Sequence, residues 1–426
     1  MTWLLYEIAL ITALLGYLPK ALWRRRLPHR GWSMRLGRYP ARVTASLQGR
    51  EALWVHAVSV GEVLAAQPLL RALVEVDPAS PLVLSTITPS GFAVASAQVA
   101  GRGVPIYFPL DVRWCVTRAL DAIRPRLLLL VESELWPMTI RLAHARGIPI
   151  AVVNGRLSPR AFARYRLVTP WLAGTMRRVD RWCMQSQADA DRAIALGAVR
   201  DRVQVTGSMK WDASVGSRPS ADAVRDTATR LGLNGRDVVI VAGSTHRGEE
   251  RAILRAFQAL QASHADARLI LAPRHLERVA EVEGLGRDAG FSTARLSRVS
   301  PAEAWRVGIV DTLGQLPCYY GLATVVFIGG SLIPHGGQNP LEAASLGKPI
   351  VFGRSMHNFE TIAHELLAHH AARQVESEQE LAALFGDLLA RRAEAQTMGR
   401  RAQALTERFQ GATDRTLEAL KPLLRG

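Results

Sequence analysis

The sequence predicts an α/β protein in which two Rossmann-like halves face each other across a cleft, preceded by a membrane-anchoring helix. Short apolar runs alternate with amphipathic stretches along most of the chain, and this alternation predicts parallel, doubly wound sheets. The chain has 426 residues, 48% of them hydrophobic. One hydrophobic core rarely serves more than roughly 250–300 residues, so we expect two domains.

The first half contains the clearer alternation. The apolar runs expected as strands are Leu53–Ala57, Leu82–Ile87, Val104–Tyr107, Leu127–Val131, Ile148–Val153, Trp182–Met184 and Val203–Val205. Stretches between them, such as Asp111–Ile123 and Gln187–Leu196, have helical spacing of apolar residues. We assign a Rossmann-like domain to residues 24–210 and a polar interdomain linker to residues 211–235.

The alternation restarts in the second half. Expected strands are Val238–Ala242, Arg268–Ala272, Gly308–Val310, Thr324–Ile328 and Pro349–Phe352, and expected helices are Gly248–Ala262, His275–Ala289, Asn339–Leu346 and Ser377–Leu389. A second Rossmann-like domain is therefore expected over residues 236–400. We expect residues 401–426 to form a helix that packs back on the first domain.

The N-terminus has the pattern of a membrane segment. Residues 3–22 are almost wholly apolar, interrupted by Glu7 and Lys20, and an arginine-rich stretch follows them. About 20 apolar residues span a bilayer as a helix, and a basic flank marks the cytoplasmic side. We expect residues 1–23 to be a membrane-anchoring helix, and Glu7 leaves open a helix that lies in the interface instead.

Composition excludes several other functions. The net charge of +16 is carried almost entirely by arginine, but aromatic residues are only 6% and no nucleic-acid-binding motif is present, so we expect no nucleic acid partner. The three cysteines are far apart and the histidines are scattered. This spacing is typical of a reduced environment and predicts no metal site.

Glu62 is the strongest candidate for a catalytic residue in the first half. It follows the predicted strand Leu53–Ala57 within Val58-Ser59-Val60-Gly61-Glu62, and a helical pattern comes after it. A carboxylate at the carboxyl end of a strand is a candidate general base. The alternative is an acid that only favours the start of a helix. If Glu62 is the base, we expect the helix N-terminus to keep it ionised, so that its strength comes from its position and not from a raised pKa.

Two further polar residues of the first half follow strands. Glu132 begins the segment Glu132-Ser133-Glu134 after the most hydrophobic run. Lys210 stands out in a chain that uses lysine at only four positions. A cation at the domain junction could stabilise negative charge that develops in a reaction, and an interdomain salt bridge is the alternative.

The densest glycine cluster, residues 329–342, follows a strand and opens a helix. Its backbone N–H groups and the helix dipole predict a phosphate site there. A helix cap formed by Asn339, Pro340 and Glu342 is the structural alternative, but a cap alone does not require the glycines. The phosphate-cradle candidates are Ser244, Thr245, Gly336 and Gly337.

Arg274 follows another strand within Ala272-Pro273-Arg274-His275. An arginine in this position grips phosphate or base well because its guanidinium is planar. The alternative is that it only holds a surface carboxylate.

Taken together, five segments resemble the Kdo transferases of lipopolysaccharide synthesis. They are His56–Glu62, Glu132–Pro137, Gly207–Lys210, Ala272–His275 and Asn339–Glu342. The resemblance runs in order from the membrane segment to about residue 370. It implies the GT-B fold and an inverting transfer of 3-deoxy-D-manno-octulosonic acid (Kdo) from CMP-Kdo to lipid IVA. It also implies that the reaction takes place at the cytoplasmic side of the bacterial inner membrane, where the protein contacts inner membrane lipids.

The resemblance also assigns roles to residues. It implies that Glu62 is the general base and that Glu132 and Lys210 support the transition state, without a cofactor or a metal. It implies that CMP is bound by Pro273, Arg274, Leu313, Gly314, Gln315, Asn339, Pro340, Leu341 and Glu342. The family usually has Glu where this chain has Gln315, so a role that needs a carboxylate at that position is in doubt.

Two other functions stay open at this point. One is a GT-B transferase or epimerase that uses a UDP-sugar, which the fold does not exclude. The other is a non-catalytic, membrane-associated scaffold that binds a nucleotide.

Overall fold

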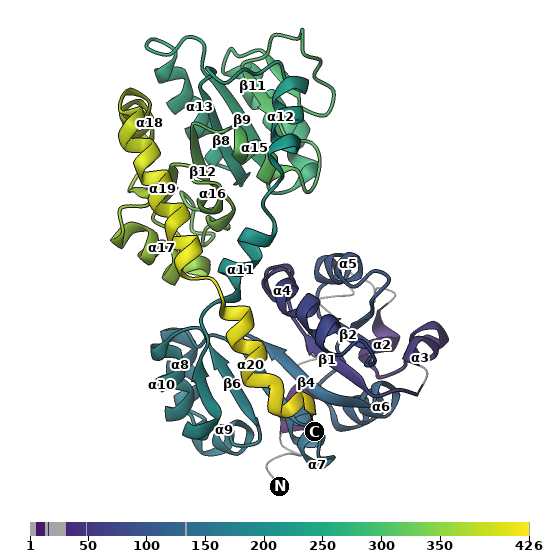
Figure 1. The fold of residues 1–426 in the computed structure, drawn as a ribbon. Coiled ribbons are helices and arrows are strands. Elements are labelled where there is room, and N and C mark those ends of the chain that lie inside the picture. Colours follow the sequence, from purple (N-terminus) through teal and green to yellow (C-terminus); the bar gives the residue numbers. More distant parts are fainter. Residues whose placement is uncertain (1–5, 13–15, 17–30, 48, 133, 426) are drawn as a thin grey trace. The chain divides into compact units, whose positions relative to one another are not determined.

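The computed structural model describes residues 6–12, 16, 31–47, 49–132 and 134–425. The chain divides into two compact units, which we describe separately. Unit 1 comprises Met1–Ala213 and Phe409–Gly426, and unit 2 comprises Ser214–Arg408 (Figure 1). The chain thus passes from unit 1 to unit 2 and returns.

Unit 1 is built on a seven-stranded parallel sheet with the order β3-β2-β1-β4-β5-β6-β7. Its strands are β1 (Ala52–His56), β2 (Leu82–Thr86), β3 (Gly103–Tyr107), β4 (Pro125–Val131), β5 (Ile150–Gly155), β6 (Arg181–Met184) and β7 (Val203–Val205). In the register, Trp54 of β1 pairs with Val83 on one side and Leu128 on the other. The strand order reverses between β1 and β4, and ligands of doubly wound sheets bind beside the carboxyl ends of such strands.

Both faces of the unit 1 sheet are buried, as is typical of parallel sheets. Trp54 belongs to one hydrophobic core, while its neighbours Leu53 and Val55 belong to the core on the opposite face. The helices of unit 1 are α2 (Trp32–Arg35), α3 (Ala41–Leu47), α4 (Val60–Val76), α5 (Pro89–Gln98), α6 (Arg113–Ile123), α7 (Pro137–Ala145), α8 (Pro159–Arg166), α9 (Thr169–Met176), α10 (Gln187–Ala195) and α20 (Ala412–Arg425), and η1 (Arg200–Arg202) is a short 3-10 turn. The helix α11 (Met209–Gly216) begins in unit 1 and ends in unit 2.

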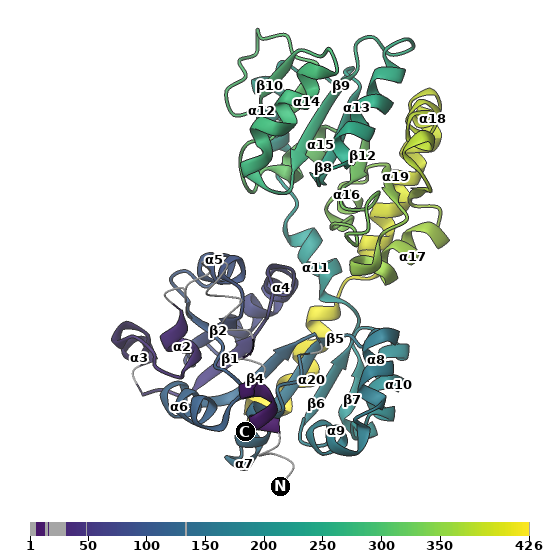
Figure 2. The same cartoon turned by 180° about the vertical axis from the view of Figure 1, so that it is seen from behind.

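The C-terminal segment forms two helices. The helix α19 (Arg392–Arg408) belongs to unit 2, and α20 belongs to unit 1, where it contacts α4, β5 and β6 (Figures 1 and 2). Leu420 and Leu424 of α20 are buried in the same core as Leu69 and Leu73 of α4. The last helix is therefore part of the core of the first unit.

Unit 2 repeats the architecture with a seven-stranded parallel sheet of order β10-β11-β9-β8-β12-β13-β14. Its strands are β8 (Val239–Thr245), β9 (Arg268–Pro273), β10 (Thr293–Arg295), β11 (Val307–Ile309), β12 (Val325–Ile328), β13 (Ile350–Gly353) and β14 (Arg373–Val375). Its helices, besides α19, are α12 (Ala221–Arg230), α13 (Glu249–Leu260), η2 (Leu276–Arg278), α14 (Val279–Asp288), α15 (Leu316–Leu322), α16 (Leu341–Ser345), η3 (His357–Phe359), α17 (Glu360–Ala368) and α18 (Glu378–Ala390). Here the strand order reverses between β8 and β12. The two predicted Rossmann-like halves are confirmed.

Most of the predicted anchor, residues 1–23, lies outside the described residues. In the part of the chain that the structure describes, no helix combines the length and the apolar character needed to cross a membrane. Residues 6–12 are helical and contact unit 1: the Tyr6 hydroxyl donates to Asp111 over 2.7 Å, and the Arg113 N–H donates to Glu7 over 2.6 Å. Glu7 thus caps the start of α6, so the described residues give no support to a spanning anchor.

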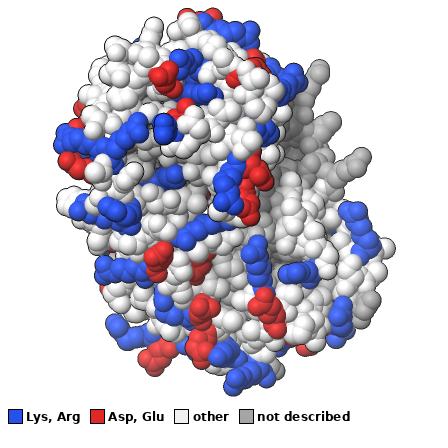
Figure 3. Space-filling model, turned by 45° about the horizontal axis from the view of Figure 1, so that its top comes forward, with Lys and Arg blue, Asp and Glu red and all other residues white. Residues whose placement is uncertain are grey.

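Charged side chains are mixed over the surface. On the face shown in Figure 3, Lys and Arg side chains are spread out, with Asp and Glu side chains between them.

Candidate active site

Glu62 lies in the first turn of α4, directly after β1. Ser59 is the N-cap of α4, and its hydroxyl donates to one carboxylate oxygen of Glu62 over 3.0 Å. The Val58 N–H donates to the other oxygen over 2.7 Å. The Ser59 hydroxyl also accepts the Glu62 N–H over 3.4 Å, so these contacts favour the start of the helix, as the alternative proposed. The side chain nevertheless stays at the carboxyl end of β1, beside the reversal point of the sheet.

The surroundings of Glu62 change its acidity. Burial, together with the nearby charges of Glu132 and Glu134, raises the pKa of Glu62 from 4.5 to about 8, and the two hydrogen bonds oppose this rise. The expectation that the helix dipole would keep this pKa low is wrong. The residue is only 9% exposed, so the loss of hydration outweighs the cap.

Glu132 and Lys210 form an ion pair at the carboxyl edge of the same sheet. The Lys210 Nζ lies 2.8 Å from Glu132 Oε1, and both side chains are largely buried. Glu132 leaves β4 with φ +60°, a conformation that costs a residue with a Cβ of order 1–3 kcal/mol. The structure therefore brings Glu62, Glu132 and Lys210 into one electrostatic group, in which Lys210 partly neutralises the carboxylate nearest to Glu62.

Lys210 is held in place by residues outside the predicted site. The neighbouring Met209 N–H donates to the side chain of Asn154 over 3.0 Å, and Asn154 is buried with φ +54° at the end of β5. Asp212 accepts hydrogen bonds from the Gly411 N–H over 2.8 Å and from both the N–H and the hydroxyl of Thr413 over 2.6 Å. The start of α11 is thereby attached to β5 on one side and to the start of α20 on the other.

The predicted phosphate cradle in unit 2 is already occupied by internal hydrogen bonds. The Thr245 hydroxyl donates to Glu250, the Gly336 N–H to the Ser355 hydroxyl and the Gly337 N–H to the Gly330 carbonyl. Thr245, Gly336 and Gly337 therefore do not offer the donors that the prediction required.

Ser244, the remaining cradle candidate, is half-buried at the end of β8. It adopts φ +54°, as Glu132 does at the end of β4.

Packing explains the glycines of this loop. Gly336 and Gly337 have φ +106° and +73°, and a Cβ on them would collide with Asn358 and Met356. Glu249, buried at the start of α13, accepts the N–H groups of Gly330, Ser331 and Leu332 over 2.6–3.0 Å. The Glu249 carboxylate thus occupies the backbone N–H groups that were predicted to bind phosphate. No pattern in the sequence indicates this contact.

The residues matched to CMP binding all follow strands of unit 2 at its carboxyl edge. Pro273 is buried at the end of β9, and Arg274 is exposed beside it. Leu313 and Gly314 are exposed after β11. The Gln315 amide oxygen accepts hydrogen bonds from the hydroxyls of Thr312 and Tyr319, each over 3.1 Å. A single amide oxygen therefore accepts both hydrogen bonds at residue 315.

The helix after the glycine loop starts one residue later than predicted. Pro340 is the N-cap of α16, and Leu341 is its first residue. Asn339 still accepts the Leu341 N–H over 3.1 Å, and its amide donates to Glu342 over 3.5 Å. Burial raises the pKa of Glu342, while the hydrogen bond from Asn339 and the charge of Arg274 oppose this rise.

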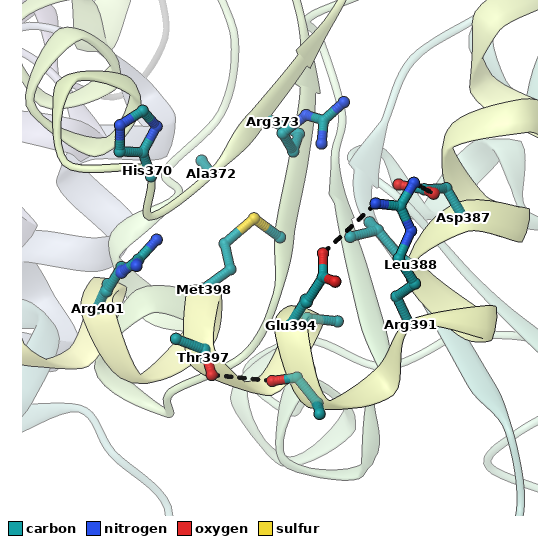
Figure 4. Close-up of a pocket in the computed structure, with 12 residues that line it drawn as sticks. His370, Ala372, Arg373, Asp387, Leu388, Arg391, Glu394, Thr397, Met398 and Arg401 are labelled. Carbon is teal, nitrogen blue, oxygen red and sulfur yellow. Dashed lines mark hydrogen bonds and ion pairs between the residues drawn. The ribbon is translucent and has the colours of Figure 1, made fainter.

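Other features of the described residues do not belong to this edge. No group of three or more His, Cys, Asp or Glu side chains is arranged to hold a metal ion in the part of the chain that the structure describes. A pocket of about 500 Å³, lined by residues such as Arg373, Glu394 and Met398, lies at the amino end of β14 (Figure 4). The amino ends of parallel strands are at the opposite edge of the sheet from Arg274 and Asn339.

Two compact units, each built on a seven-stranded parallel sheet, give the chain a GT-B-like fold. The fold is similar to that of a UDP-GlcNAc 2-epimerase from Neisseria meningitidis, solved with UDP-GlcNAc bound, with a TM-score of 0.60 at 15% identity, covering 87% of this chain and all of that chain. At this identity the likeness concerns the fold alone.

Sequence relatives define the family. The family described as 3-deoxy-D-manno-octulosonic-acid transferase (kdotransferase) matches residues 30–213. The chain is 35% identical over 418 residues to the 3-deoxy-D-manno-octulosonic acid transferase of Bordetella pertussis, covering 95% of each chain. It is 31% identical over 389 residues to that of Haemophilus influenzae, covering 91% of this chain and 90% of the relative. The chain belongs to the Kdo transferase family, which confirms the resemblance, and it is a glycosyltransferase.

Proposed function

We propose that this protein transfers Kdo from CMP-Kdo to lipid IVA, with inversion at the sugar carbon. The observation that carries the proposal is the group of Glu62, Glu132 and Lys210 beside the β1–β4 reversal point, in a chain of this family. A buried base and a buried cation are what an alcohol needs as it attacks a sugar carbon from which a phosphate group departs.

In the proposed reaction, the acceptor hydroxyl oxygen attacks the anomeric carbon of Kdo. The bond between that carbon and the phosphate oxygen breaks, and its electron pair leaves with CMP. The hydroxyl proton passes to the Glu62 carboxylate, which must be in its ionised form. Because the pKa of Glu62 is about 8, the carboxylate is a stronger base than an exposed glutamate.

Glu132 and Lys210 act through charge in this proposal. Lys210 holds Glu132 at 2.8 Å and supplies a positive charge beside the reacting groups. The positive character that develops on the sugar carbon is stabilised by Glu132, while Lys210 limits how far Glu132 suppresses the ionisation of Glu62. The edge of unit 2 with Arg274, Gln315 and Asn339 is the proposed site for CMP.

The test is a transfer assay with purified protein, CMP-Kdo and lipid IVA, followed by mass spectrometry of the lipid. We expect wild type to add the mass of Kdo and Glu62→Gln to add none. Glu75→Gln, an exposed glutamate near the end of the same helix α4, is the matched control and should keep full activity. Full activity of Glu62→Gln would overturn the assignment of the base.

The same preparation tests the donor. We expect CMP to protect the protein from thermal unfolding more than UDP does. Stronger protection by UDP would favour the UDP-sugar alternative, and nucleotide binding without transfer by wild type would favour the scaffold.

We also propose that the protein works at the cytoplasmic face of the inner membrane through a surface of unit 1. Ile8 and Ile11 are 51% and 41% exposed, and the Tyr6 ring packs at a tilt against Trp171 of α9, with 5.5 Å between ring centroids. Leu167 and Val168, just before α9, are 84% and 45% exposed. Exposed arginines on the preceding helix α8 are Arg160, Arg164 and Arg166. Apolar side chains beside arginines suit an interface with anionic lipid.

A sedimentation assay with phosphatidylglycerol vesicles tests this surface. A variant that carries both Leu167→Glu and Val168→Glu should bind the vesicles several-fold more weakly than wild type. Equal binding would show that the surface does not contact lipid.

A further inference from the structure

Three histidines of unit 2 lie together at the carboxyl edge of its sheet. His246 follows β8, His275 follows β9, and His335 is in the loop after β12. These strands are neighbours in the order β9-β8-β12, so the topology gathers the three residues at the reversal point of the sheet. The His246 and His335 ring centroids are 3.9 Å apart, and those of His246 and His275 are 5.9 Å apart.

The surrounding structure holds the His246 and His335 rings in position. The His246 N–H donates to Glu249 over 2.9 Å, and the same carboxylate binds the Gly330 N–H at the start of the loop that carries His335. The side chain of Gln338 lies 3.1 Å from His246 Nε2. The Glu249 carboxylate accepts hydrogen bonds from backbone N–H groups. It therefore fixes the positions of the two loops and does not pair with the imidazoles.

The charges that face His246 are mainly positive. Burial, together with His335, His275, Arg274 and Arg278, lowers the pKa of His246 to about 4. Arg278 is paired with the buried Glu250 over 2.6 Å, while Arg274 is exposed beside His275. Two close imidazoles cannot both carry a proton cheaply unless a negative group compensates them.

We propose that His246 and His335, together with Arg274, bind an oxyanion of the sugar-nucleotide donor, and that the bound anion draws a proton onto the histidine pair. The proposal rests on the proposed function for the identity of the donor. The imidazolium N–H groups and the guanidinium then donate to the anion. The site takes the place of the predicted glycine cradle, whose N–H groups are occupied by Glu249 and by the loop itself.

Two oxyanions of the donor have this chemistry: the phosphate of the nucleotide and the carboxylate of the sugar. Titrations with CMP, cytidine and CMP-Kdo distinguish them. Weaker binding of both CMP and CMP-Kdo by the variants would identify the phosphate. Weaker binding of CMP-Kdo alone would identify the carboxylate.

The test is calorimetry of the full-length protein at pH 7 in two buffers of different ionisation enthalpy, which counts the protons taken up on binding. We expect wild type to take up a measurable fraction of a proton with the anion that the pair binds. His246→Gln and His335→Gln should lose this uptake and bind about tenfold more weakly. Cytidine, which has no anion, should bind without proton uptake to wild type and variants alike.

His264→Gln is the matched control, because His264 is half-buried before the amino end of β9, at the opposite edge of the sheet from the three histidines. It should bind and take up protons as wild type does. Thermal melts check that each variant is folded, and His246→Asn provides a second variant if His246→Gln does not fold. Unchanged affinity and unchanged proton uptake in the folded variants would overturn the histidine site alone. Failure of wild type to bind either CMP or CMP-Kdo would overturn the proposed donor, and this site with it.

Discussion

Replacing Glu62 by Gln should stabilise the protein in a pH-dependent way while abolishing transfer. Gln resembles the protonated carboxyl group and keeps an acceptor for the Val58 N–H. The pKa of Glu62 rises from 4.5 to about 8 on folding. As pH increases through this range, the unfolded chain loses the proton while the folded chain keeps it. The free energy of unfolding of wild type therefore falls from about pH 4.5 to about pH 8 and then levels off.

The size of the effect follows from the pKa. Each pH unit between the two pKa values is worth about 1.4 kcal/mol, so the whole rise is worth up to roughly 5 kcal/mol. Between pH 5.5 and pH 9, the advantage of Glu62→Gln over wild type should grow by about 3 kcal/mol. Because the side chain is only 9% exposed, solvent screens little of this energy.

Urea unfolding followed by tryptophan fluorescence measures this difference, since Trp54 and Trp182 are buried in unit 1. Wild type, Glu62→Gln and the exposed control Glu75→Gln are compared at pH 5.5 and pH 9. We expect the growing advantage only for Glu62→Gln. The same advantage at both pH values would refute the argument that Glu62 is buried as a neutral acid.

Three further predictions follow from the two units. Glu132→Gln removes a charge that raises the pKa of Glu62, so the rise of kcat/KM with pH should move to lower pH. Lys210→Met leaves the Glu132 charge without its ion-pair partner, so the rise should move to higher pH. Measured pH–rate profiles of the two variants test both shifts. Asp212→Ala removes the hydrogen bonds that cap the start of α20, so the free energy of unfolding measured in urea should fall by about 1–2 kcal/mol. The transfer rate should also fall, because Asp212 and Lys210 lie on the same helix, α11. An unchanged urea midpoint would contradict the role of Asp212 as a cap. Gly337→Ala should lower the melting temperature more than Gly290→Ala, because both have positive φ but a Cβ on Gly290 meets no described atom within 4 Å.

The strands that build the two sheets could be predicted because they are buried on both faces. The expected strand Leu53–Ala57 and the observed β1 (Ala52–His56) differ by one residue at each end. The strands β10 and β14 were not predicted. They are three-residue strands at the edge of the sheet, and Arg295 and Arg373 within them interrupt any apolar pattern.

The candidate site could be predicted where a residue lies in the segment that follows a strand, as Glu62, Glu132 and Arg274 do. It could not be predicted where distant parts of the chain meet. Glu249 fills the turn at Gly330 from 81 residues away, and the pKa of Glu62 depends on burial that no local pattern reveals. The roles of the named residues in catalysis and CMP binding stay predictions until the assays are done.

The return of the chain to unit 1 has a consequence for how the protein is made. Unit 2 is continuous from Ser214 to Arg408, whereas the core of unit 1 needs Leu420 and Leu424 of the last helix. A ribosome therefore releases all of unit 2 before it releases the residues that complete unit 1. Domains fold as units during synthesis, so the half that begins the chain is the last to finish folding. Until α20 has been synthesised and packed, Leu69 and Leu73 of α4 lack the apolar neighbours Leu420 and Leu424.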